Sequence, residues 1–355
     1  MYKEIEIENF RGIRSLQLKD MRRINLIAGR NNSGKTSVLE ALLLLTGISN
    51  PKLALDIHQL RNLALQQNED FGFMFHNQNF ASDILLKAID GSDAVRELCI
   101  SPKYESNVIL ATDEQAKKPV SQNLANGALT TSIPKIESME MRFKVGDAKE
   151  RITGISLKGG KIELRMLQGH PNPINGAFFT PQNCVQPVDE FLEKLLVKKK
   201  LSSVIPVLQE IAPTIQDIRM GAKGMVYVDF GLDTLLPLNI MGDGIRKILT
   251  FLAAIVGMGN GIILIDEIEN GLHYSTLKTL WKALISASRE QGVQIVATTH
   301  SYECLSALAE VNEESPDSED IVRLYRMEKR DGQTTTFLYD RELLKLGIEK
   351  NIEMR

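Results

Sequence analysis

Apolar and polar residues alternate at period two from Tyr2 to Phe10, and a short, continuous apolar segment follows at residues 24–28. Alternation at period two is typical of a strand with one buried face, whereas the continuous segment fits a strand buried on both faces. An apolar helix is predicted at about residues 34–45, and Gly47 is expected to end it. The chain therefore begins as strand, turn, strand and helix.

Two more apolar segments occur late in the chain, at residues 261–266 and 293–298. Near-continuous runs of this kind are typical of parallel strands that helices cover on both faces. An amphipathic helix is predicted between them, and we expect Trp281 on its apolar side to lie in the core. These segments predict an α/β fold.

The middle of the chain has a different pattern. Short alternating segments within residues 82–167 predict an antiparallel sheet, which we interpret as a loose surface insertion after the first helix. Apolar residues at helical spacing in residues 187–218 predict a helical subdomain, and another helix is expected at 53–65. Residues 312–320 are acidic and are expected to form a solvated loop.

The string Gly29-Arg30-Asn31-Asn32-Ser33-Gly34-Lys35-Thr36 fits the pattern G-x-x-x-x-G-K-[ST], between a predicted strand and a predicted helix. The glycines allow a tight turn whose N–H groups point into one concavity, and the helix N-terminus adds positive charge. We therefore expect this loop to bind ATP, with Lys35 on the β- and γ-phosphates and Thr36 on Mg²⁺. Ser37 is expected to make a weaker contact, to the α-phosphate.

Acidic side chains follow the first of the two late strands. Asp266 and Glu267 come directly after residues 261–265, and ligands bind at the carboxyl ends of strands in open α/β sheets. Asp266 suits the Mg²⁺ shell, and Glu267 is expected to polarise an attacking water. The second strand ends in Thr298-Thr299-His300-Ser301, so His300 is expected beside the γ-phosphate or the water.

A second glycine-containing turn, Gly242-Asp243-Gly244, precedes an apolar helix predicted at residues 248–256. Two glycines at a helix start form a nest for an anion. Because the chain already has one phosphate loop, this second nest is expected to serve another subunit. The pattern thus predicts a head-to-tail dimer with two ATP molecules between the protomers.

Composition excludes several classes of protein. A chain of 355 residues suits one large α/β domain with insertions, or two lobes that share a core. The formal net charge of -3 argues against a histone-like nucleic-acid binder, although a local basic patch stays open. Three widely spaced cysteines favour a reducing cytosol, and no export signal or membrane span is visible. We expect a cytoplasmic protein without a membrane partner.

Taken together, the motifs resemble those of the ABC-type ATPases of the RecF, structural-maintenance-of-chromosomes (SMC) and OLD group. The string Asn9-Phe10-Arg11-Gly12 looks like the N-terminal strand of that group, whose arginine approaches the nucleotide, so Arg11 is a candidate ligand. Gly242-Asp243-Gly244 is similar to the signature motif that closes on the partner's ATP. Residues 266–273 look like a fused Walker B motif and D-loop, His300 matches the switch histidine, and Gln182 lies where a Q-loop is expected.

The strings GDGIRK, DEIENGLH and TTHSYEC also occur in standalone OLD-like ATP-binding proteins of bacteria, so the resemblance covers the whole chain. It implies an ABC-type P-loop ATPase head with a mixed, mainly parallel core sheet, an antiparallel β insertion and a helical signature lobe. We expect lobe I at residues 1–186, with the insertion at about 82–167. The helical lobe is expected at 187–258, and the half with Walker B, D-loop and switch histidine at 259–355.

The sequence departs from the group's pattern in several places. Met241 or Gly242 stands where the signature serine is expected, which weakens the expected contact to the partner's γ-phosphate. No coiled coil interrupts the chain, so long-range DNA tethering is not expected. About 55 residues follow His300, too few for the Toprim nuclease domain of an OLD nuclease, so any nuclease is expected to be a separate protein.

The main functional hypothesis is Mg²⁺-dependent hydrolysis of ATP by a homodimer or higher oligomer, with Lys35, Glu267 and His300 as catalytic residues. The ATPase would act as a switch or scaffold for a separate effector, such as a Toprim-type or other nuclease, in anti-phage defence, as the resemblance implies. The alternative is a DNA-repair clamp or loader of RecF type, with Lys198-Lys199-Lys200 and Arg22-Arg23 as candidate DNA contacts. A transporter ATPase is a third interpretation, which the large β insertion disfavours.

Overall fold

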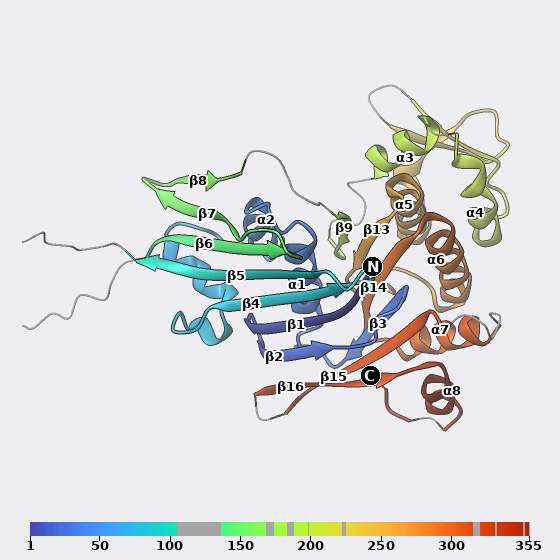
Figure 1. Ribbon diagram of the computed structural model, residues 1–355. Helices are drawn as coiled ribbons and strands as arrows, with labels where there is room; N and C mark the ends of the chain where they lie inside the picture. The colour runs from blue at the N-terminus through green and yellow to red at the C-terminus, as the bar shows by residue number, and fades with distance from the viewer. Residues whose placement is uncertain are drawn as a thin grey trace, which may run out of the picture.

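The computed structural model describes residues 1–104, 136–167, 174–182, 188–197, 199–221, 225–314, 320–330, 332–350 and 352–354. Its central sheet has the strand order β16-β15-β3-β14-β13-β9 (Figure 1). The parallel strands are β3 (Ile24–Gly29), β9 (Asn175–Phe179), β13 (Gly261–Ile265), β14 (Val293–Thr299) and β15 (Val322–Arg330). Strand β16 (Gln333–Tyr339) is antiparallel and forms one edge. The apolar segments at 261–266 and 293–298 are therefore parallel strands, as predicted, and the buried strand predicted at 24–28 lies in the same sheet.

A second, antiparallel sheet has the order β2-β1-β4-β5-β6-β7-β8. Its strands are β1 (Tyr2–Phe10), β2 (Ile13–Leu18), β4 (Ile84–Asp90), β5 (Val95–Tyr104), β6 (Ile136–Val145), β7 (Arg151–Lys158) and β8 (Lys161–Arg165). The interpretation as a loose insertion was wrong, because β4 pairs with β1 and continues the N-terminal hairpin. Side chains such as Leu86, Ile100 and Met141 are each only 1% exposed.

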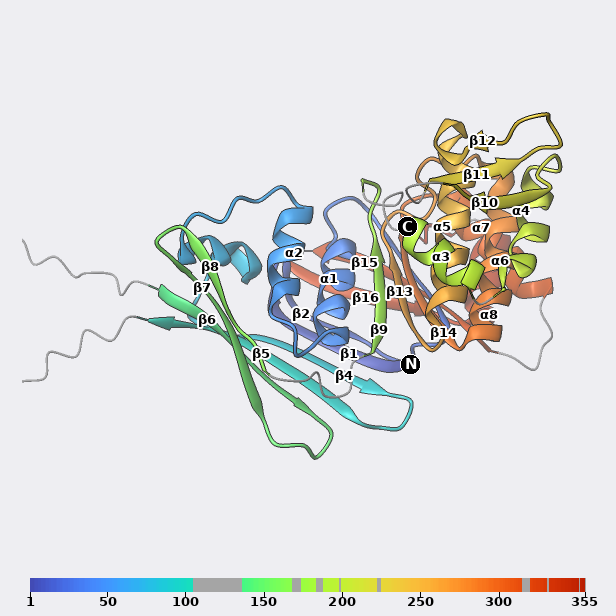
Figure 2. The same ribbon diagram turned by 90° about the horizontal axis from the view of Figure 1, so that it is seen from above.

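Helix α1 (Lys35–Thr46) packs between the two sheets, as Figure 2 shows. Its apolar residues, including Val38 and Leu42, share one core with Ile7 of the antiparallel sheet and with Ile262 and Val296 of the central sheet. Helix α2 (Lys52–Leu60) is shorter than predicted, and 3-10 turns follow at Asn68–Met74 and His76–Gln78. The phosphate loop therefore leads into a helix that is fixed on two sides.

The other face of the central sheet is covered by α5 (Asp243–Met258), α6 (Leu277–Gln291) and α7 (Tyr302–Glu314). Trp281 is fully buried, as predicted, and its Nε1 donates to the main-chain oxygen of Cys304 at 3.2 Å. Asn312 is a buried residue of α7, which ends at Glu314, so the first part of the expected acidic loop is helical instead; residues 315–319 lie outside the described residues. Helix α8 (Arg341–Glu349) packs beside α7.

The lobe before α5 contains α3 (Val188–Val197), α4 (Ile205–Ile211) and 3-10 turns at Leu201–Ser203 and Leu238–Ile240. It also contains a three-stranded antiparallel sheet that was not predicted, formed by β10 (Asp217–Met220), β11 (Val226–Asp229) and β12 (Leu236–Pro237). Strands this short show too little alternation to stand out from a helical pattern. No helix in the described part of the chain has the length and apolar character needed to cross a bilayer.

Candidate nucleotide-binding site

The phosphate loop joins the end of β3 to the start of α1. Gly29 and Gly34 have φ angles of 152° and 102°, in the region that favours glycine. A Cβ atom on Gly29 would lie 2.5 Å from the main-chain oxygen of Met327, so a side chain there would collide with the neighbouring strand β15. The glycines of the motif thus match the backbone conformation and the close packing of the loop.

Lys35 is 8% exposed, and its Nζ donates to the main-chain oxygens of Gly29 at 2.6 Å and Arg30 at 3.0 Å. Burial lowers the pKa of Lys35, and the carboxylates of Asp266, Glu267 and Glu269 oppose that shift. The structure therefore brings this ammonium group close to the carboxylates that follow β13.

Thr36 and Asp266 lie in direct contact although 230 positions separate them. The Thr36 hydroxyl donates to the Asp266 carboxylate, with oxygen–oxygen distances of 2.9 and 3.1 Å. The Thr298 hydroxyl donates to Asp266 Oδ1 at 2.6 Å. Hydroxyl and carboxylate oxygens are the ligand types that Mg²⁺ prefers, so Thr36 and Asp266 form a donor set that fits this ion.

Glu267 has a φ angle of 50°, which is uncommon for a residue with a side chain. Its main-chain N–H donates to Thr298 Oγ1 at 2.9 Å, and the N–H of Ile268 donates to the Thr298 main-chain oxygen at 3.1 Å. Such strained conformations cost about 1–3 kcal/mol and cluster at functional sites. Thr298 thus fixes both Asp266 and Glu267, a role that the sequence analysis missed.

His300 follows β14, and its main-chain N–H donates to Glu269 Oε1 at 3.0 Å. The same oxygen lies 3.3 Å from His300 Nδ1, while the imidazole is 47% exposed. In the sequence, Glu269 stands out only as part of the string that looks like a Walker B motif and D-loop. Its spacing from the strand end gave no sign that it would turn back to contact His300.

Gln182 is exposed and follows β9. Strand β9 pairs in parallel with β13, so the carboxyl ends of the two strands lie side by side. There the main-chain oxygen of Phe179 accepts a hydrogen bond from the Asp266 N–H at 2.8 Å. Residues 183–187, directly after Gln182, lie outside the described residues. The structure thus brings the main chain near Gln182 to the edge that carries Asp266.

The expectation that Arg11 approaches the nucleotide is not supported by its contacts. Its Nε forms an ion pair with Glu40 of α1 at 3.1 Å, and Nη1 donates to the main-chain oxygen of Phe73 at 3.0 Å. The side chains of Arg11 and Glu40 are 6% and 1% exposed. A buried carboxylate requires a partner charge, and Arg11 supplies it inside the core.

The signature-like turn lies against the D-loop of the same chain. Gly242 caps α5, and a Cβ atom on Gly244 would lie 3.2 Å from Leu272 Cδ2. Lys247, which is 5% exposed, donates to the main-chain oxygen of Asn270 at 2.6 Å and to its side-chain oxygen at 2.9 Å. Asp243 is exposed and forms an ion pair with Arg246.

Comparisons with known proteins agree with this geometry. The family described as "AAA domain, putative AbiEii toxin, Type IV TA system" matches residues 117–306, more than half of the chain. A second family, described as "AAA ATPase domain", matches residues 1–158. The chain belongs to the AAA domain family. This AAA ATPase therefore has the P-loop ATPase character that its sequence predicted.

Two curated relatives differ in how much they cover. A Helicobacter pylori protein named ATP/GTP phosphatase is 24% identical to the AAA ATPase over 344 residues, which cover 88% of each chain. An uncharacterized protein of Methanocaldococcus jannaschii is 33% identical over 124 residues, which cover 30% of this chain and 56% of that protein.

Solved structures show the fold of the AAA ATPase. One SMC head, bound to the C-winged helix domain of ScpA, has a TM-score of 0.52 at 11% identity and covers 96% of this chain and 98% of its own. A Pyrococcus furiosus SMC head with an extended coiled coil, bound to the C-terminal domain of ScpA, has the same score and identity and covers 99% of each chain. The predicted ABC-type head fold is confirmed.

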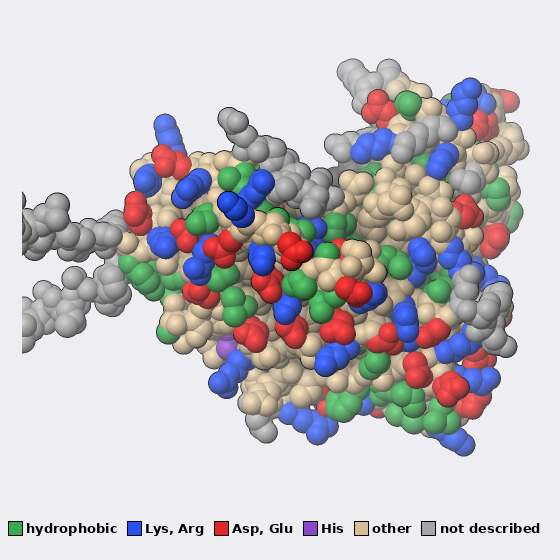
Figure 3. Space-filling view, in the orientation of Figure 1, with side chains coloured by type: hydrophobic (Ala, Val, Ile, Leu, Met, Phe, Trp, Pro, Cys, Tyr) green, Lys and Arg blue, Asp and Glu red, His purple; other side chains and the backbone are tan. Residues whose placement is uncertain are grey.

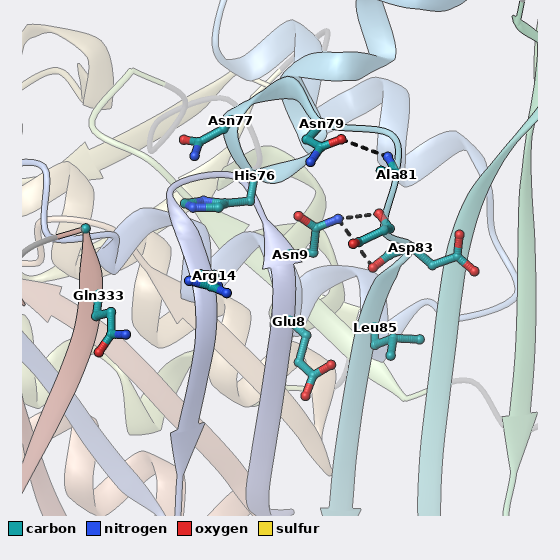
Figure 4. Close-up of a pocket in the computed structure, with 12 residues that line it drawn as sticks. Glu8, Asn9, Arg14, His76, Asn77, Asn79, Ala81, Asp83, Leu85 and Gln333 are labelled. Carbon is teal, nitrogen blue, oxygen red and sulfur yellow. Dashed lines mark hydrogen bonds between the residues drawn. The ribbon is translucent and has the colours of Figure 1, made fainter. Parts of the chain in front are cut away.

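A wider concavity of about 900 Å³ opens beside the N-terminal hairpin of the AAA ATPase (Figure 4). Its lining includes Asn9, whose Nδ2 donates to the main-chain oxygens of Ser82 and Asp83, and His76, whose Nδ1 lies 3.1 Å from the main-chain oxygen of Arg11. No residue of the phosphate loop lines it, so this concavity is separate from the nucleotide site.

Proposed function

We propose that this AAA ATPase binds and hydrolyses ATP in the cytoplasm, forms a dimer around ATP, and acts as a switch for a separate effector in bacterial anti-phage defence. The observation that carries the proposal is the hydrogen-bonded series Thr36–Asp266–Thr298–Glu267 beside the phosphate loop. It joins the loop, the Mg²⁺ donor set and the proposed general base in one rigid arrangement.

The proposed chemistry needs mainly positioning and charge neutralisation, because phosphoryl transfer passes through a loose transition state. The backbone N–H groups of residues 29–34 and the Lys35 ammonium bind the β- and γ-phosphates. Thr36 and Asp266 would hold Mg²⁺, which would neutralise phosphate charge when bound. Glu267 orients the attacking water and accepts its proton, and His300, held by Glu269, lies at the neighbouring strand end.

Several observations support the dimer. Ile240 and Tyr274, which flank the signature-like turn and the D-loop, are 66% and 68% exposed. Exposed apolar side chains that gather into a patch mark surfaces that bind partners, and we propose that these two side chains belong to such a patch. The likeness to SMC heads supports the same arrangement. We propose that Gly242, Asp243 and Gly244 contact the ATP of the other protomer, and that the lobes divide at residues 186 and 258.

The substrate and the biological setting rest on the relatives. The name ATP/GTP phosphatase of the Helicobacter pylori relative supports a nucleoside triphosphate as substrate. The family description, which names a toxin of a type IV toxin–antitoxin system, supports a link to an effector and to defence. A nuclease encoded as a separate chain is the effector we propose.

Hydrolysis that depends on dimerisation tests this function. The rate of phosphate release per molecule should rise with protein concentration and then level off, because each site is completed by a second protomer. Lys35→Ala should abolish release, whereas Lys161→Ala, an exposed lysine on β8, should leave it unchanged. A rate per molecule that stays constant over a hundredfold range of concentration would contradict the shared site.

The RecF-type alternative gains no support from its candidate basic residues. Arg22 forms ion pairs with Asp20 at 2.8 Å and Asp320 at 3.6 Å, and Arg23 Nη1 donates to the main-chain oxygen of Ser288 at 3.1 Å. Lys200 donates to Gln291 at 2.9 Å, and Lys198 lies outside the described residues. On the face shown in Figure 3, basic and acidic side chains are interspersed.

A gel-shift assay at low salt separates the two functions, because contacts to DNA phosphates weaken steeply as salt rises. We expect no shift of duplex or single-stranded DNA at low salt. A shift that disappears as salt is raised would favour the clamp or loader.

A further inference from the structure

A cavity of about 360 Å³ lies beside the phosphate loop, between the loop and the end of β15. Its lining consists of two short segments, Arg30-Asn31-Asn32-Ser33 and Arg326-Met327-Glu328-Lys329-Arg330. Cavities of this size are within the range that binds small molecules. The proposed hydrolysis assigns no role to the second segment.

The sheet order indicates which part of a nucleotide would enter this cavity. Strand β15 lies on one side of β3, and β14 and β13 lie on the other (Figure 1). In the proposed function Asp266 and Glu267, which follow β13, act at the γ-phosphate, so that end of the nucleotide would point toward β13. The nucleoside end must then leave the loop in the opposite direction, toward β15.

The lining offers polar groups that have no partner within the protein. Ser33 is 4% exposed, and its Oγ makes no hydrogen bond. The Nε of Arg326 is also buried without a partner. Buried polar atoms are rarely left unpaired in folded proteins, so these atoms indicate that a ligand completes the site.

Glu328 is the carboxylate among the residues that line this cavity. Its side chain is 17% exposed, and its two carboxylate oxygens are bound by Arg326 and, at 2.8 Å, by Arg330. An ionised carboxylate has about four lone-pair sites, so acceptor capacity remains. Arg330 is 76% exposed at the rim, and an ion pair at the edge of its planar guanidinium leaves the faces of that group available to stack on an aromatic base.

We propose that this cavity is the nucleoside subsite, and that Glu328 accepts a hydrogen bond from the exocyclic amino group of a purine base while Arg330 stacks on its ring. Adenine and guanine both carry such a group, whereas hypoxanthine does not. This inference rests on the proposed function, because it assumes that a nucleoside triphosphate occupies the phosphate loop.

The test compares KM values for ATP, GTP, ITP and inorganic tripolyphosphate in wild type, Glu328→Ala and the control Glu163→Ala, an exposed glutamate on β8. Glu328→Ala should raise KM roughly tenfold for ATP or GTP, whichever is the better substrate, as expected for a lost hydrogen bond to a charged group. The KM values for ITP and tripolyphosphate should change less than about twofold. Glu163→Ala should change none of them.

An equal rise in KM for all four substrates would assign Glu328 a structural role and overturn the inference. An unchanged KM for both ATP and GTP would place the base elsewhere and would also overturn it. Either result leaves the proposed function intact as long as wild type hydrolyses ATP and Lys35→Ala does not. If wild type hydrolyses no nucleotide, the proposed function itself fails.

Discussion

Replacing Arg11 with methionine should destabilise the fold without weakening nucleotide binding. The guanidinium, 6% exposed, pairs at 3.1 Å with Glu40, which is 1% exposed and also pairs with Arg61 at 2.6 Å. Removing one partner of a buried ion pair costs about 3–5 kcal/mol. Because Arg61 would remain beside Glu40, we expect a loss near the lower end, about 3 kcal/mol, in the free energy of unfolding measured with urea.

The controls for this prediction use the same cluster. Arg61→Met removes a partner that is 37% exposed, so it should cost about 1 kcal/mol or less. The pair Arg11→Met and Glu40→Leu should recover much of the stability, since apolar residues often replace buried ion pairs without loss. A variant Arg11→Met with nearly unchanged stability and a tenfold higher KM for ATP would contradict the structural role and restore Arg11 as a nucleotide ligand.

Three further changes test the site. Thr298→Val removes the hydroxyl that bonds Asp266 and Glu267, so hydrolysis should fall about 10–100-fold while the Kd for ATP, measured by calorimetry, changes little. Lys247→Met breaks the contact with Asn270, so the rate should reach its plateau only at higher protein concentration, with binding of ATP by monomers unchanged. Chelation of Mg²⁺ with EDTA should stop phosphate release, and added Mg²⁺ should restore it; full activity in EDTA would exclude the donor set of Thr36 and Asp266.

The central strands and the phosphate loop were predictable because their signals are local. A continuous apolar run indicates a strand buried on both faces, and the glycines of the loop have the φ angles and tight packing that require glycine. Because Thr36 follows one predicted strand and Asp266 another, their positions in the motifs predict that both lie at one edge of the sheet. The structure brings these two side chains within 2.9 Å.

Long-range pairing was not predictable in the same way. Alternation predicted strands within residues 82–167, but no local signal shows that Ile5 lies opposite Ala88, which joins these strands to the N-terminal hairpin. The contacts of Thr298 and Glu269 depend on how neighbouring strand ends turn, which spacing along the chain does not encode. Arg11 was predicted to approach the nucleotide only because of the resemblance. Its ion pair with the buried Glu40 of α1 is a contact that no local pattern predicts.

The most direct test of the account is the molar mass of Glu267→Gln in the presence of ATP and Mg²⁺, measured by size-exclusion chromatography with light scattering. This change keeps the size of the side chain but removes the proposed general base, so ATP should persist and hold two protomers together. We predict a mass twice that of the 39.7 kDa chain, and the mass of one chain when Lys35→Ala is added. A monomer with bound ATP would contradict the shared site on which the proposed switch depends.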